Sequence, residues 1–69
     1  MDVAKRIKLI IVEKGLYQRF VAEKVGFTEQ QFSDMLNGRK IIRAEHIPAI
    51  AKALGVDFNE LFATDRVEL

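Results

Sequence analysis

The segment of residues 18–39 constrains the fold of this chain more than any other part. It contains two stretches with the apolar spacing of short helices, and Gly26 separates them. Thr28 and Gln31 have the spacing of a capping box, which predicts that the second helix begins just after Thr28. Gly26 adopts a positive φ at little cost, so the chain can pass from one helix into the next within a few residues. The segment therefore predicts a helix-turn-helix unit.

The apolar residues of both stretches predict which faces of the two helices are buried. They recur at the spacing of a single helix face. Those of the first stretch are Phe20, Val21, Ala22 and Val25, and those of the second are Phe32, Met35 and Leu36. Ala22 is small enough to lie where the two helices cross.

Two longer helices are predicted on either side of this unit. The first is expected at residues 3–14, where Asp2 can cap its start and Gly15 can end it. The other is expected to begin within residues 44–46 and to end at Leu54, since Pro48 is tolerated in a first turn. Their expected core residues are Val3, Ile7, Ile10, Ile11, Ile47, Ile50, Ala51 and Leu54.

The remaining segments are shorter. Residues 39–43 are expected to form an extended loop, with Ile41 or Ile42 anchored on the core. Asp57 and Glu60 have the spacing of a second capping box, which predicts a fifth, short helix at about residues 58–62. Residues 64–69 are expected to be a frayed tail.

Length and patterning together indicate an all-α protein. The 69 residues suit a single domain, residues 1–69, and no strand alternation or internal repeat is present. The longest apolar run, residues 9–12, is too short to span a bilayer, and no signal-peptide cleavage site follows the basic residues before it. We therefore expect a compact five-helix bundle without membrane association.

Catalytic chemistry has little support in this sequence. His46 is the only histidine, and a lone histidine beside Glu45 is more often a surface or helix-end residue than a catalyst. The absence of cysteine excludes a Cys-based zinc site, and neither a phosphate-binding loop nor a dinucleotide motif is present. We expect no enzyme activity, no metal and no cofactor.

The order of several motifs resembles a known family. The stretches GLYQRFVAEKVGFTEQQFSDMLNGRK and IPAIAKALGVDFNELF are similar to the helix-turn-helix domain of phage repressor and Cro-type (XRE-like) regulators. The resemblance covers residues 7–62, and its marks are Gly15-Leu16, Gln18, Ala22, Gly26, Asn37-Gly38 and Leu54-Gly55-Val56. It implies a bundle of the phage-repressor DNA-binding type, with the helix-turn-helix at helices 2 and 3. Tyr17 departs from the family, which usually has a serine or threonine cap at this position.

The charge distribution favours a DNA-facing surface in the first part of the chain. Residues 1–43 carry nine Lys and Arg against five Asp and Glu, whereas residues 44–69 carry two against five. The first part is therefore +4 and the second −3, which together give the net charge of +1. Ordinary scatter of charges in a short domain is the alternative explanation.

The second helix of the unit, residues 28–37, is expected to enter the major groove with its N-terminal residues first. Its polar side carries the candidate base contacts Gln30, Asp34, Glu29 and Ser33. Gln30 is the strongest of these, because an amide can bind adenine N6 and N7, and the carboxylates can accept from cytosine N4. The candidate phosphate contacts are Gln18, Arg19, Thr28, Asn37, Arg39, Lys40 and Arg43. For Gln18 this role is implied by the family resemblance.

These features predict a sequence-specific, double-stranded DNA-binding transcriptional regulator. The resemblance implies a homodimer on DNA and a cytoplasmic protein of bacterial or phage origin. Its dimer surface is sought at the helix 4–5 corner and the tail, where Phe58, Phe62 and Val67 are either exposed or part of the core. The alternative is an antitoxin-like or adaptor module that binds protein on the same fold. The weak net charge and the acids at Glu29 and Asp34 favour that alternative, whereas the basic loop disfavours it.

Overall fold

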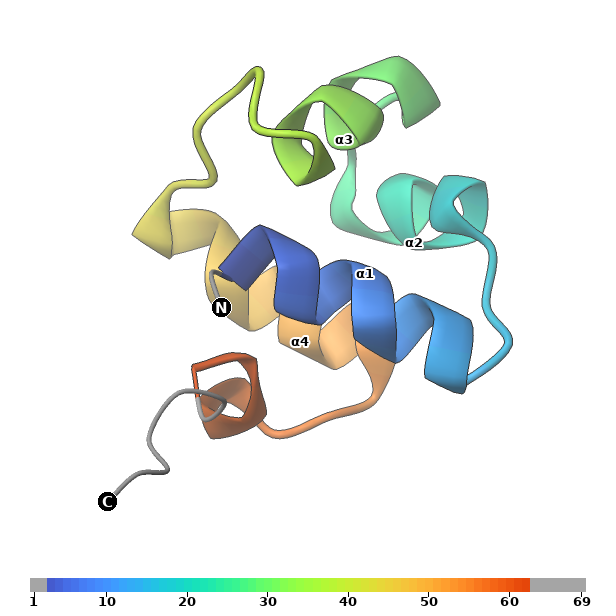
Figure 1. The fold of residues 1–69 in the computed structure, drawn as a ribbon, viewed down its shortest axis with the longest axis vertical. Helices are drawn as coiled ribbons and strands as arrows, with labels where there is room; N and C mark the ends of the chain where they lie inside the picture. Colours follow the sequence, from blue (N-terminus) through green and yellow to red (C-terminus); the bar gives the residue numbers. More distant parts are fainter. Residues whose placement is uncertain (1–2, 63–69) are drawn as a thin grey trace.

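The computed structural model describes residues 3–62 of the chain. These residues contain four α-helices and two 3₁₀ helices, joined by turns and short loops (Figure 1). In chain order they are α1 (Val3–Glu13), α2 (Gln18–Val25), α3 (Glu29–Leu36), η1 (Ala44–His46), α4 (Ile47–Leu54) and η2 (Phe58–Leu61). These residues contain no strand, so the predicted all-α class is confirmed for them. Asp2 and the predicted tail lie outside the described residues.

The prediction of a fifth α-helix is wrong, because η2 is a single 3₁₀ turn. Its main-chain bonds join residues three apart, from Glu60 N–H to Asp57 O (2.9 Å) and from Phe62 N–H to Asn59 O (3.1 Å). The Asp57 side chain accepts from Asn59 N–H at 3.1 Å rather than forming the expected capping box with Glu60. A segment this short gains little from α-helical bonds, and 3₁₀ geometry is common in such pieces. The bundle therefore has four α-helices in its described part.

The capping box at the start of α3 is present as predicted. The N–H of Gln31 donates to Thr28 Oγ1 at 3.0 Å, and the N–H of Thr28 donates to Gln31 Oε1 at 2.9 Å. Two of the donors that a helix N-terminus leaves without partners are thus satisfied by side chains. The start of α3 is therefore specified locally, within four residues.

The turn before α3 depends on Gly26, which has a φ of 95°. The N–H of Phe27 donates to Ala22 O (2.9 Å) and that of Gly26 donates to Glu23 O (3.2 Å), which is a Schellman motif. Only a residue that tolerates left-handed φ closes α2 in this way. Two residues then connect this closure to α3, so the angle between the helices is set within a short segment.

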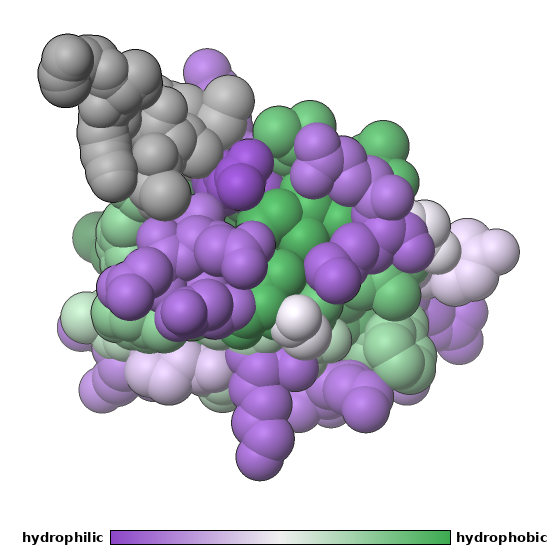
Figure 2. All heavy atoms as spheres, turned by 90° about the horizontal axis from the view of Figure 1, so that it is seen from below, coloured by the Kyte–Doolittle hydropathy of each residue, from purple (hydrophilic) through white to green (hydrophobic). Residues whose placement is uncertain are grey.

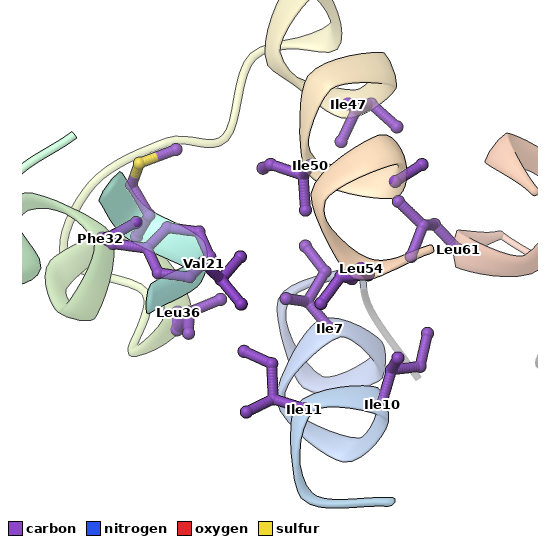
Figure 3. Close-up of a cluster of buried hydrophobic side chains, with 13 residues drawn as sticks. Ile7, Ile10, Ile11, Val21, Phe32, Leu36, Ile47, Ile50, Leu54 and Leu61 are labelled. Atoms are coloured by element: carbon purple, nitrogen blue, oxygen red, sulfur yellow. The ribbon is translucent and has the colours of Figure 1, made fainter. Parts of the chain in front are cut away.

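The buried residues of α1 and α4 meet in one core cluster (Figure 3), and the other elements pack around these two helices (Figure 1). The helix-turn-helix packs on one side of this pair, through contacts of α2 with α4 and of α3 with α1. On the other side η2 contacts both α1 and α4. Seen from below the view of Figure 1, apolar residues reach the surface between hydrophilic ones (Figure 2).

The core between these elements contains nearly all of the predicted apolar residues (Figure 3). Buried residues are Ile7, Ile10, Ile11, Val21, Ala22, Phe32, Met35, Leu36, Ile47, Ile50, Ala51, Leu54 and Leu61. Val3 and Val25 are partly buried against this cluster. Phe20 was predicted to lie on the buried face, but it is 44% exposed, so that prediction is wrong. Ile42 is the anchor of the 39–43 loop, because Ile41 is 79% exposed.

Candidate nucleic-acid interface

The polar side of α3 faces away from the core. Phe32 has no exposed surface, and this burial turns the opposite side of the helix outward. Glu29 and Gln30 are exposed in the first turn, and Ser33 and Asp34 are half-buried one turn later. All four predicted base-contact residues therefore lie along one side of the same short helix.

An open hollow lies on the surface between the first turn of α3 and the start of α2. It is lined by Gln18, Thr28, Glu29, Gln30 and Ser33. The helix-turn-helix thus brings Gln18, which is distant in sequence, next to three of the four candidate base contacts. A surface of amide, hydroxyl and carboxylate groups offers both donors and acceptors to a ligand.

Thr28 keeps one unused hydrogen-bonding group at the edge of this hollow. Its Oγ1 accepts from Gln31 N–H, so the hydroxyl hydrogen stays available to an acceptor outside the protein. The position at the N-terminus of α3 also favours an anion, because the helix dipole is positive at that end. Thr28 therefore combines a structural cap with a donor suited to a phosphate oxygen.

A hydrogen-bonded chain joins the middle of α3 to the loop that follows it. Gln30 Nε2 donates to Asp34 Oδ1 at 3.0 Å, and Arg39 Nη1 approaches the same oxygen at 3.4 Å. The Arg39 and Lys40 N–H groups both donate to the Asp34 carbonyl, at 2.8 Å and 3.2 Å. Asp34 therefore contacts three other candidate site residues, Gln30, Arg39 and Lys40.

Asn37 is held against α1 by its side chain. Its Nδ2 donates to the Ser33 carbonyl at 2.9 Å, and its Oδ1 accepts from Lys8 Nζ at 3.2 Å. Lys8 was not among the site residues predicted from the sequence. Nothing in the local pattern signals a contact between residues 29 positions apart.

The basic candidates flank the helix-turn-helix rather than line its hollow. Arg39, Lys40 and Arg43 are exposed in the segment between α3 and η1. Arg19 is exposed on α2, where it lies 3.9 Å from Glu23 in an ion pair that contributes little to stability. These side chains are therefore accessible to a second molecule.

Two aromatic residues beside the hollow were not among the predicted site residues. Tyr17 is 79% exposed and caps α2 through its backbone conformation alone, in agreement with the missing hydroxyl cap. Phe20 is partly covered by Lys24, whose Nζ lies 5.2 Å from the ring centre. Both line a second hollow that shares Gln18 and Glu29 with the first. The one sequence signal for these aromatic residues was Tyr17, which stands where the family usually has a serine or threonine.

His46 takes no part in this surface. Its ring packs edge-on against Phe27, with 5.0 Å between ring centres, beneath the turn that joins α2 and α3. This contact supports the turn from the α4 side, so His46 acts as a packing residue.

Comparison with known families identifies the fold type. A family model described as the Cro/C1-type helix-turn-helix DNA-binding domain matches residues 6–66. The matched range contains every α2 and α3 residue and the hollow between them. Within residues 3–62, no helix has the length and apolar character needed to cross a membrane.

Proposed function

The chain belongs to the Cro/C1-type helix-turn-helix DNA-binding family, and we propose that it is a sequence-specific transcriptional regulator that binds double-stranded DNA. The observation that carries this proposal is the exposure of Gln30 in the first turn of α3, opposite the buried Phe32. A helix-turn-helix inserts its second helix into the major groove with these first residues leading. The exposure of Gln30 in this turn supports it as the leading base contact.

In the proposed complex, α3 reads bases through its polar side. Gln30 binds the N6 and N7 edge of an adenine, and Ser33 is short enough to reach either a donor or an acceptor. Glu29 accepts from a cytosine N4 amine near the start of the helix. Asp34 lies on the same side, and its contacts with Gln30 and Arg39 reduce the repulsion that a carboxylate meets near phosphates.

Phosphate contacts position the protein on both sides of the groove. On the α2 side, Gln18, Arg19 and the hydroxyl of Thr28 surround the hollow or lie next to it. On the far side, Arg39, Lys40 and Arg43 follow α3 in an exposed segment. Asn37 is exposed and is proposed as a further contact through its side-chain amide, whose Nδ2 would exchange its hydrogen bonds to Ser33 for one to a phosphate oxygen.

We further propose that two copies bind DNA as a homodimer through η2. Phe58 and Phe62 are 45% and 50% exposed, and their rings contact each other with 5.3 Å between centres. Exposed aromatic pairs of this kind are enriched at protein interfaces. Their position on the side of α1 and α4 away from the helix-turn-helix leaves α3 free for DNA.

The function is tested by selecting bound sequences from a random duplex pool at near-physiological salt. We expect a defined site, and we expect Gln30→Ala to weaken binding to it by roughly 1–3 kcal/mol. In Gln30→Ala we expect the base preference to relax at one base pair in each half-site and to stay unchanged at the other base pairs. Binding to scrambled duplex stays nearly the same, because a neutral side chain releases no counterions.

The same measurement separates this function from protein binding. A parent protein that enriches no sequence, or a Gln30→Ala variant with the parent's ratio of selected to scrambled binding, contradicts the proposal. A thermal melt of Gln30→Ala is the control for folding, and we expect it to match the parent because Gln30 is exposed.

A further inference from the structure

The position of the Gln30 side chain depends on a carboxylate one helical turn further along α3. Gln30 Nε2 donates to Asp34 Oδ1 at 3.0 Å, and the Asp34 side chain is 31% exposed against 69% for Arg39. The Asp34 side chain is therefore more buried than that of Arg39, which contacts the same carboxylate. Residues four apart on a helix lie above one another, so this contact runs along the helix axis.

The chemistry of this contact decides which way the Gln30 amide points. An ionised carboxylate can only accept hydrogen bonds, so the amide must turn its NH₂ group toward Asp34 and its Oε1 away from it. One N–H of Gln30 then remains for another partner, next to Oε1. Gln30 thus presents a donor and an acceptor in a fixed order, with the donor on the Asp34 side.

This order matters because the two orientations of an A·T pair differ in the major groove. Adenine offers the N7 acceptor and the N6 amine side by side, and reversal of the base pair reverses their order across the groove. An amide that is free to rotate by half a turn about its last bond can match either orientation. An amide held by Asp34 matches one of them.

Arg39 completes the arrangement. The Arg39 guanidinium lies 3.4 Å from the same Asp34 oxygen. The main-chain N–H of Arg39 donates to the Asp34 carbonyl at 2.8 Å, so Arg39 is held at the end of α3 by both its main chain and its side chain. The positive charge offsets that of the carboxylate beside the negatively charged DNA. The guanidinium therefore reduces the repulsion between the Asp34 carboxylate and nearby phosphates.

From these contacts we propose that Asp34 is a positioning residue for base reading. It fixes the Gln30 amide and thereby makes the protein select one orientation of an A·T pair over the other. The inference rests on the proposed function, since it requires that Gln30 reads DNA. Asp34 contributes to specificity through Gln30 and not through a base contact of its own.

The test uses Asp34→Asn, whose amide both accepts and donates and so permits either orientation of Gln30. Binding is measured to the selected duplex and to the duplex with that one pair reversed, at the base pair whose preference Gln30→Ala relaxes. The parent is expected to discriminate between them roughly 5- to 150-fold. In Asp34→Asn we expect this ratio to fall at least about fivefold, mainly because the reversed duplex binds better.

Glu23→Gln is the matched control. It removes a carboxylate that also lies beside an arginine, Arg19, but on α2 and outside the Gln30 contact. It is expected to raise binding to both duplexes equally through charge, with the ratio unchanged. An Asp34→Asn variant that behaves like this control overturns the inference, because Asp34 then acts through its charge alone.

The double variant Gln30→Ala, Asp34→Asn separates indirect from direct reading. If Asp34 acts through Gln30, the double variant keeps the ratio of Gln30→Ala, and a further change means that Asp34 contacts a base itself. A parent that selects no sequence overturns the proposed function together with this inference. A parent with a defined site, relaxed by Gln30→Ala but not by Asp34→Asn, overturns the inference alone.

Discussion

At the scale of single residues, the two sides of α3 have separate tasks. Phe32 is fully buried and stacks parallel to Phe27 at 6.3 Å between ring centres, so it joins α3 to the turn before it. Gln30 is exposed on the other side, where its side chain contacts Asp34 at the surface. Core packing and the proposed base contact therefore fall to different side chains two positions apart.

Phe32→Ala is expected to lower the free energy of unfolding by about 3–5 kcal/mol, because the cavity left by a large aromatic side chain closes only in part. That loss is comparable with the whole stability of a domain of this size, so the variant is expected to be largely unfolded. Urea titration followed by circular dichroism measures it. Ile41→Ala is the control, since Ile41 is 79% exposed, and its change is expected to stay within about 0.5 kcal/mol. Equal losses in both variants contradict this assignment of the core.

At the scale of elements, the helix-turn-helix is defined mainly by how its helices end. α2 closes at Gly26, and α3 closes at Gly38 with the same bonding pattern, from Arg39 N–H to Asp34 O and from Gly38 N–H to Met35 O. The second closure also starts the segment that carries Arg39 and Lys40. Helix termini therefore position both α3 and the basic segment that follows it.

Gly26→Ala is expected to destabilise the protein by roughly 1–2 kcal/mol through backbone strain alone. A Cβ at this position meets no atom within 4 Å, so a steric clash adds nothing to the strain at a φ of 95°. Gly26→Asn is the matched variant and is expected to cost less, because asparagine adopts left-handed φ more readily. The two midpoints of urea unfolding give the comparison. Equal stability of Gly26→Ala and the parent is the result that this account does not allow.

At the scale of the whole molecule, the first and last elements share one core. Leu61 of η2 is buried in the same cluster as Ile7 and Ile10 of α1, and Arg6 Nε donates to the Glu60 carbonyl at 3.1 Å. This packing places the exposed Phe58 and Phe62 on the side of the bundle opposite to the helix-turn-helix. The proposed dimer and DNA surfaces are therefore separate.

If two copies pair through η2, the selected site is expected to be a pseudo-palindrome with half-site centres about one helical turn apart. Phe62→Asp then places like charges near the two-fold axis and is expected to weaken binding to the full site about tenfold or more. Binding to a duplex with a single half-site is the control and stays unchanged. An asymmetric site bound by one protomer, or equal effects of Phe62→Asp on both duplexes, contradicts dimerisation through this surface.

Sequence alone was sufficient for several features whose deciding groups lie within a few residues of one another, although the Asp57–Glu60 capping box, also local, was predicted and did not form. The Thr28–Gln31 capping box, the left-handed Gly26 and the buried faces of α3 and α4 were all predicted, and all are present. Each depends on local hydrogen bonds or on helical periodicity, and both of these are properties of a short stretch of chain. The family was also recognisable, because its marks are local features in a fixed order.

Only the tertiary structure decided which of the apolar residues are buried and which residues distant in sequence contact each other. It selected Ile42 over Ile41 as the loop anchor, left Phe20 outside the core, and brought Lys8 to Asn37 across 29 residues. The sequence pattern allows either Ile41 or Ile42 to anchor the loop on the core, because the two residues are adjacent and equally apolar. The choice follows from how the loop lies against the core, whose residues come from segments distant from it in sequence.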